Sequence, residues 1–276
     1  MEEKSITNTQ ELSKLTINFD EHPEAFVVIE LWKIYMTSNE KFRSNKSIVN
    51  EIQNWLNENK LQGTKVYYAV YRKVNIYKLY SLLGFILKNG IGIKADENRA
   101  FYWYKRAADE IDNPFAQSRV GNFYQFGEGT EVNYESAFSY YQKSASHGNA
   151  IGIYYLGLCH EKGCGTNPNS KQAFELYKLS ASVGFPEAQY MLATCYYRGY
   201  GTRISLQKAF FWYFLAAEDG DNDRAKFAIG YCFRNGFGLV KDIHASLKFF
   251  RRTDGAPEVS SEAFIHFDRI FRYRHG

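Results

Sequence analysis

A period of 36 or 37 residues runs through most of this chain and limits its fold more than any other feature. The dipeptide Leu-Gly, with the variants Val-Gly, Leu-Ala and Ile-Gly, places its second residue at positions 84, 121, 157, 193 and 230. A Gly-x-Gly pair begins six residues after each of these positions. A fixed period of about 20 to 50 residues is typical of stacked repeats, in which each unit buries its apolar face against its neighbours. The chain is therefore expected to fold as a repeat array.

Each unit is expected to form two helices joined by a glycine turn. In the third unit, apolar residues follow the three-and-four spacing of a helix over residues 150–162 and 171–183. The first glycine of each pair stands where a left-handed residue would end the first helix. The second helix begins after a residue type that favours N-cap positions, namely Asp96, Asn133, Asn169 or Ser205. In the fifth unit Asp242 takes this part, and Ser246 takes the place of the repeated alanine.

Small residues recur inside the helices. A glycine in mid-helix costs about 1 kcal/mol of helix propensity, so its recurrence at positions such as Gly121 and Gly157 indicates the close approach of another helix. We expect the Ala-Ala or Ser-Ala pairs of the second helices, such as Ser180-Ala181, to form the facing surface. A larger side chain at either place would overpack this contact.

The motif Leu-Gly-x-x-Tyr-x-x-Gly-x-Gly is followed by Asp or Asn, Ala, an aromatic-Tyr pair and Ala-Ala, and it recurs five times over residues 76–255. This pattern resembles the Sel-like repeat (SLR) family, whose members are relatives of tetratricopeptide repeats. The resemblance implies an all-α fold, a right-handed α-solenoid of five helix-turn-helix repeats that scaffolds protein assemblies. The tyrosine slot departs from the motif at Leu87, His160 and Phe233.

The segments outside the repeats have patterns of their own. We expect a disordered N-terminal tail over residues 1–20, an N-terminal helical cap over 21–65, the repeat solenoid over 66–255 and a C-terminal capping helix over 256–276. An exposed, partner-binding helix is the alternative for the last segment. Within the cap, apolar stripes predict helices over residues 24–37 and 47–59, with a turn at 61–64.

The two helices of the N-terminal cap resemble the helical segment that joins a protein-kinase domain to SLR repeats in some eukaryotic proteins. The chain has no glycine-rich nucleotide loop, no His-Arg-Asp catalytic loop and no Asp-Phe-Gly motif. Kinase activity therefore does not follow from the resemblance.

No group of residues in the sequence predicts catalysis, a cofactor or a metal site. Three cysteines, Cys159, Cys195 and Cys232, occupy one repeat slot and are expected to be small buried hydrophobes. A metal cluster of Cys159, His160 and Cys164 lacks a second pair at zinc spacing. His160 lies in an aromatic slot, where a structural histidine is expected.

The composition favours a cytoplasmic protein, with the nucleus as a second location. The four cysteines fit a reducing compartment, and the polar N-terminus is not followed by the apolar region of a signal peptide. The sequence has no apolar stretch of about 18 residues, so no membrane span or membrane partner is expected.

If the array is similar to tetratricopeptide repeats, the first helix of each unit lines an inner groove. The residues that this similarity places in the groove, and that we predict to bind a protein, are Tyr154, Tyr190, Tyr197, Arg198, Phe227, Tyr231 and Arg234. Tyrosine and arginine are frequent contact anchors because they bury a large area and keep polar reach. The alternative is that several of these side chains pack between neighbouring helices.

Three functions are consistent with these observations. The first is a non-enzymatic scaffold or adaptor that binds a peptide or protein in the groove. The second is a regulatory fragment or partner of a kinase-like signalling protein. The third is a helical-repeat RNA binder, which is disfavoured by the nearly even balance of 34 basic and 30 acidic residues and by the lack of a base-reading pair in each unit.

Overall fold

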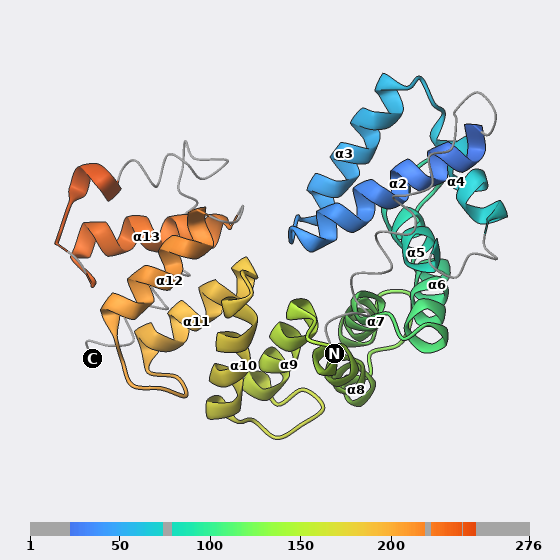
Figure 1. Ribbon diagram of the computed structural model, residues 1–276. Coiled ribbons are helices and arrows are strands. Elements are labelled where there is room, and N and C mark those ends of the chain that lie inside the picture. Colours follow the sequence, from blue (N-terminus) through green and yellow to red (C-terminus); the bar gives the residue numbers. More distant parts are fainter. Residues whose placement is uncertain (1–22, 74–78, 219–221, 239, 247–276) are drawn as a thin grey trace. The chain divides into compact units, whose positions relative to one another are not determined.

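The computed structural model describes residues 23–73, 79–218, 222–238 and 240–246. Over these ranges every regular element is a helix, which confirms the all-α repeat fold (Figure 1). The chain divides into two compact units, Met1–His147 (unit 1) and Gly148–Gly276 (unit 2). The tail expected over residues 1–20 and the final helix expected over 256–276 lie outside the described residues.

Unit 1 holds an N-terminal group of three helices and the first two repeats. The N-terminal helices are α2 (Pro23–Glu40), α3 (Asn45–Glu58) and α4 (Gly63–Arg72). The repeats are the pairs α5 (Tyr80–Asn89) with α6 (Glu97–Glu110) and α7 (Pro114–Phe126) with α8 (Tyr134–Ser146). Consecutive helices of the repeats pack against one another from α5 to α8.

Unit 2 holds the remaining repeats. They are the pairs α9 (Ala150–Lys162) with α10 (Ser170–Ser182) and α11 (Pro186–Arg198) with α12 (Leu206–Glu218), followed by α13 (Asp223–Asn235). A helical turn at residues 243–246 follows α13, at the position where the second helix of the fifth repeat is expected. Here too, each helix from α9 to α13 packs on the next.

The N-terminal helices differ from the prediction in two places. Helix α2 runs through the polar run at Ser38 and ends at Glu40, because Ser38 is buried and its hydroxyl donates to the Glu51 carboxylate at 2.9 Å. Part of the turn predicted at residues 61–64 is instead the start of a third helix, α4, whose Val66 and Val70 lie in the core.

The predicted caps of the repeats are confirmed. A left-handed glycine ends every first helix, at Gly90, Gly127, Gly163, Gly199 and Gly236. The side chains of Asp96, Asn133 and Asn169 accept the backbone N–H three residues ahead. In the fifth repeat Asp242 accepts the N–H of Ala245 at 3.0 Å, and Ser246 is buried. Sequence reasoning missed a second set of caps, at the start of first helices, formed by Asn113, Asn149 and Asn222.

The sequence predicts that the mid-helix glycines face the Ala-Ala or Ser-Ala pairs, and this prediction is wrong. They face a buried tyrosine of the second helix in the same repeat. A Cβ built on Gly84 or Gly157 would lie 2.8 Å from the ring of Tyr104 or Tyr177, and one on Gly121 would overlap the ring of Tyr141. The tyrosine ring occupies the space that a side chain at the glycine position would fill, so only glycine fits there without a shift of the ring. In the Ser-Ala pairs the serine hydroxyl donates instead to the start of the first helix, as from Ser180 to the carbonyl of Ala150 at 2.7 Å.

In three of the Gly-x-Gly pairs the second glycine joins successive repeats. A Cβ on Gly129, Gly201 or Gly238 would overlap the backbone carbonyl of Glu97, Ser170 or Leu206, respectively. Each carbonyl belongs to the first residue of the second helix in the preceding repeat. The turn of one repeat therefore rests on the helix start of the repeat before it.

Candidate protein-binding site

The first helix of each repeat has an equivalent face, and in unit 2 this face carries the predicted binding residues. On this face we define the anchor slot as the residue three positions before the Gly or Ala of the Leu-Gly dipeptide. The anchor slots are Ser81, Ser118, Tyr154, Tyr190 and Phe227. They are small in unit 1 and aromatic in unit 2.

The predicted residues of unit 2 lie at different depths on this face. Tyr190, Tyr197 and Phe227 are buried, with exposed fractions of 8%, 3% and 6%. Tyr154 and Tyr231 are half-buried, and Arg198 and Arg234 are exposed. The tyrosines thus form the floor of the face, and the two arginines project from it.

The aromatic anchors of unit 2 pack on the tyrosine of their own second helix. The ring centroids of Tyr190 and Tyr213 are 5.5 Å apart, and those of Tyr154 and Tyr177 are 6.0 Å apart. Burial raises the pKa of Tyr190, and the guanidinium groups of Arg224 and Arg198 act in the opposite direction. The Tyr190 hydroxyl therefore lies within the electrostatic reach of both arginines.

The other two tyrosines are held by the turn after α13. The ring centroid of Phe237 lies 6.0 Å from that of Tyr197 and 5.8 Å from that of Tyr231. Because Phe237 sits between them, both rings are held in place before any partner binds.

In unit 1 the chain itself covers the equivalent face. Tyr35 of α2 is buried, and its ring centroid lies 5.2 Å from that of Phe85 in α5 and 5.8 Å from that of Phe115 in α7. Burial raises the pKa of Tyr35 well above its ordinary value; the nearby Tyr104 adds to this effect, and Arg119 opposes it. Tyr104 stands in unit 1 where Tyr177 and Tyr213 stand in unit 2. Helix α2 thus supplies the aromatic ring that the small anchor slots lack.

A polar contact extends this cover along the second repeat. Arg119 of α7 donates from Nη2 to Asn45 Oδ1 at 2.9 Å, and its guanidinium lies 4.7 Å from the ring centroid of Phe115. The N-terminal helices therefore contact the second repeat as well as the first. Sequence reasoning missed Tyr35, Phe115 and Arg119; the signal that could have found them is the pair of serines in the anchor slots of unit 1.

The buried cysteines and His160 do not form a reactive group. Cys159, Cys195 and Cys232 are buried as predicted, and burial raises the pKa of each thiol to about 12. Burial also lowers the pKa of His160. Across the described ranges, no group of three or more His, Cys, Asp and Glu side chains is placed to hold a metal ion. Thiols that stay protonated at neutral pH are weak nucleophiles.

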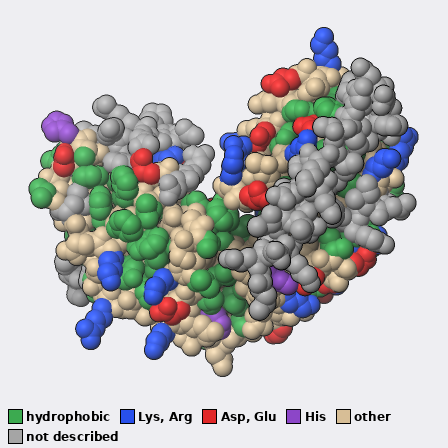
Figure 2. All heavy atoms as spheres, viewed as in Figure 1, with side chains coloured by type: hydrophobic (Ala, Val, Ile, Leu, Met, Phe, Trp, Pro, Cys, Tyr) green, Lys and Arg blue, Asp and Glu red, His purple; other side chains and the backbone are tan. Residues whose placement is uncertain are grey.

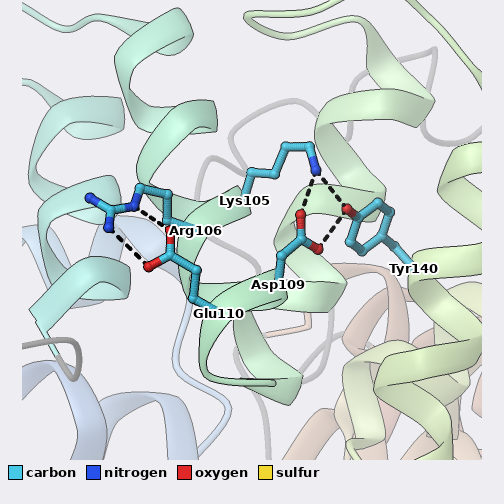
Figure 3. A network of polar contacts seen from close by, with 5 residues as sticks. All are labelled: Lys105, Arg106, Asp109, Glu110 and Tyr140. Atoms are coloured by element: carbon cyan, nitrogen blue, oxygen red, sulfur yellow. Dashed lines mark hydrogen bonds and ion pairs between the residues drawn. The ribbon is translucent and has the colours of Figure 1, made fainter.

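A polar network crosses the second helices of unit 1. Figure 3 shows Lys105 and Asp109 of α6 directed toward Tyr140 of α8. Lys105 Nζ donates to Asp109 at 2.5 Å and to the Tyr140 hydroxyl at 3.1 Å, and that hydroxyl donates to Asp109 at 2.8 Å. Partial burial acts to raise the pKa of Asp109, but the bonds from Lys105 and Tyr140 outweigh it and lower the pKa. The groups satisfy one another, so the network fastens the two helices together.

Figure 2 shows hydrophobic side chains gathered over α11 to α13 of unit 2, with Lys and Arg side chains along the lower margin of this unit. Among the helices that the structure describes, none is long and apolar enough to cross a membrane.

Comparison with known proteins identifies the repeats. The family model of the Sel1 repeat matches residues 80–112, 114–149, 150–185, 186–221 and 223–253, which together are more than half of the chain. A Sel1 repeat protein from Oxalobacter formigenes superposes with a TM-score of 0.67 at 22% identity, over 85% of this chain and 99% of that one. The protective antigen c5321 of uropathogenic Escherichia coli, which displays an SLR fold, superposes with a TM-score of 0.60 at 22% identity, over 81% of this chain and 52% of that one. At these identities the likeness concerns the fold alone.

A curated relative matches a short part of the array. It is the chitin synthase regulator SKT5 of Saccharomyces cerevisiae, 46% identical over 50 residues. The match covers 18% of this chain and 7% of the yeast protein. Because the family model matches all five repeats, this chain belongs to the Sel1 repeat family.

Proposed function

We propose that this chain is a non-enzymatic, cytoplasmic scaffold that binds a peptide or protein segment on the first-helix face of unit 2. The observation that carries the proposal is the contrast between the two units. Helix α2 occupies this face in unit 1, whereas in unit 2 Arg198 and Arg234 are exposed beside the half-buried Tyr231.

The composition of the face supports protein binding. Tyrosine and arginine are enriched among the few residues that dominate binding energy at protein interfaces. Tyr231 is already held against Phe237, so little side-chain entropy is lost when a partner covers its ring. The arginines can then pair with carboxylates or carbonyl groups at the rim.

A double substitution tests the proposal. Tyr231→Ala with Arg198→Ala removes one ring and one charge from the face, and Tyr68→Ala with Lys65→Ala removes the same kinds of group from exposed sites on α4. Tagged proteins are used to capture partners from nuclease-treated lysate, and thermal unfolding confirms that each variant is folded. We expect specific proteins to be lost with the first variant and kept with the second. Equal capture by wild type and both variants would contradict the proposal.

A second candidate is the regulation of an enzyme by binding to it. It is favoured by the match to the chitin synthase regulator, although that match spans only 50 residues. A kinase-like signalling partner, suggested by the N-terminal helices, is one form of this candidate. Recovery of an enzyme among the proteins that depend on Tyr231 and Arg198 would support it, and a recovered set that contains no enzyme would count against it.

A further inference from the structure

In the described part of unit 2, one margin carries an excess of positive charge. It consists of the last turns of α9, α11 and α13 and the turns that follow them. We name its exposed cations the basic row: Lys162, Arg198, Arg203, Arg234 and Lys241. Within the described residues, none of the five has a side-chain hydrogen bond or an ion pair with a carboxylate.

The two carboxylates of the same margin accept hydrogen bonds from groups outside the basic row. Glu161 accepts the hydroxyl of Tyr177 at 2.5 Å, and Asp242 accepts the backbone N–H of Ala245 at 3.0 Å. Both bonds belong to the repeat itself, one between paired helices and one at a helix cap. They hold the two carboxylates in place, and five cations remain against two acidic groups.

The corresponding margin of unit 1 is different. There Lys88 forms an ion pair with Glu128, and Glu131 lies in the same turn as Glu128. The positions equivalent to Lys162 and Arg198 are Asn89 and Phe126. The Sel1 repeat fold therefore does not itself require a basic row. Cations near a helix C-terminus do favour the helix dipole, but Arg203 and Lys241 lie beyond the helices.

We propose that the basic row binds an extended, acidic segment of a protein partner. This inference rests on the proposed function and names the chemistry of the segment. An extended chain advances about 3.3 Å per residue, so a short segment that carries several carboxylates can pass from one repeat to the next.

The aromatic residues beside the row favour a protein over a nucleic acid. Tyr197 is buried, and Phe237 packs between it and Tyr231. The hydroxyl of Tyr200 donates to the carbonyl of Glu161 at 3.2 Å. Single-stranded nucleic acids bind chiefly where several aromatic faces are open for base stacking, whereas here Tyr197 is buried and Tyr231 is half-buried.

The test uses the full chain and fluorescent peptides built from Gly-Ser-Glu triplets, with Gly-Ser-Gln peptides of equal length as the uncharged probe. We expect the Glu peptide to bind, the Gln peptide not to bind, and the affinity to fall as salt is raised. Replacing all five residues of the basic row by Gln should weaken binding at least about tenfold. The matched control replaces five exposed lysines of the N-terminal helices by Gln, namely Lys41, Lys46, Lys60, Lys65 and Lys73, and should leave binding unchanged.

Three results would overturn the inference. One is equal binding of the Glu peptide by wild type and the row variant, with both folded by thermal unfolding. Another is equal weakening in the lysine control, which would show a general charge effect. The third is tighter binding of a polyuridylate oligonucleotide than of the peptide, lost in the row variant. If the row variant still captures the partners that depend on Tyr231, the inference of an acidic segment is wrong, but the proposed scaffold function is not contradicted.

Discussion

The ring centroid of Tyr35 in α2 lies 5.2 Å from that of Phe85 in α5, and this contact ties the N-terminal helices to the repeat array. Tyr35 fills space beside the small anchor slots of unit 1, where unit 2 uses its own aromatic residues. The two units thus solve the same packing problem in different ways. In unit 1 helix α2 packs on the first-helix face, and we propose that in unit 2 this face binds a partner.

The role of Tyr35 predicts a large loss of stability on truncation. Replacing a fully buried aromatic residue by alanine typically destabilises by about 3–5 kcal/mol, and Tyr35→Ala should fall in this range. Denaturant unfolding measures the effect, with the exposed Tyr68→Ala as control at below about 1 kcal/mol. Equal effects of the two substitutions would show that Tyr35 is not part of the packed core.

The glycines opposite the buried tyrosines should not tolerate a methyl group in unit 1. A Cβ at position 121 would overlap the ring of Tyr141, so Gly121→Ala should destabilise by about 1–3 kcal/mol. At the equivalent position of the fourth repeat Ala193 is native, and Ala193→Gly should cost about 1 kcal/mol through helix propensity. Equilibrium unfolding of both variants checks the pair. A neutral or stabilising Gly121→Ala would contradict the assigned reason for the glycine.

The network around Asp109 should make stability depend on pH in the acid range. The pKa of Asp109 is lowered in the folded state, so its contribution is present above the ordinary carboxyl pKa and is lost as the pH falls through the lowered value. The unfolding free energy of wild type should exceed that of Asp109→Asn by less than about 1 kcal/mol near neutral pH, because the group is partly exposed. This difference should shrink below about pH 4. A difference that stays constant across the acid range would rule out the lowered pKa.

The repeat-slot cysteines should react slowly with alkylating reagents. Burial raises the pKa of Cys159, Cys195 and Cys232 to about 12, so the thiolate is scarce at neutral pH and is also inaccessible. Cys164 is half-buried in a turn and should be modified first. Mass spectrometry after a short exposure to iodoacetamide measures the order. Modification of a repeat-slot cysteine before Cys164, in folded protein, would show that the array opens locally.

The period of the sequence was sufficient to predict the features that every repeat contains. The left-handed Gly163 and the Asn169 cap follow from local chemistry, because glycine and asparagine have strong positional preferences at helix ends. The predicted contact of Gly157 with Ala181 is wrong. The sequence places both Ala181 and Tyr177 on the buried side of the second helix, and either could face the glycine. Only the side-chain packing decides between them.

The cover of unit 1 could not be read from the period. Tyr35 lies outside the repeats and meets residues far along the chain, such as Phe115, so no local spacing reports the contact. The burial of the predicted binding residues could not be predicted either, because it depends on how each side chain packs. Tyr190 and Arg198 lie on one helix and one face, but the ring turns onto Tyr213 while the guanidinium remains exposed.

The most direct test of the binding face is site-specific photo-crosslinking in cells. A photoreactive phenylalanine analogue replaces Tyr231 on the first-helix face or, as the matched position, Tyr102 on the exposed side of α6. We expect covalent adducts with partner proteins from position 231 that disappear when Arg198→Ala is added, and none of these adducts from position 102. Adducts with the same proteins from both positions, or from position 102 alone, would contradict the claim that the first-helix face of unit 2 is the binding surface.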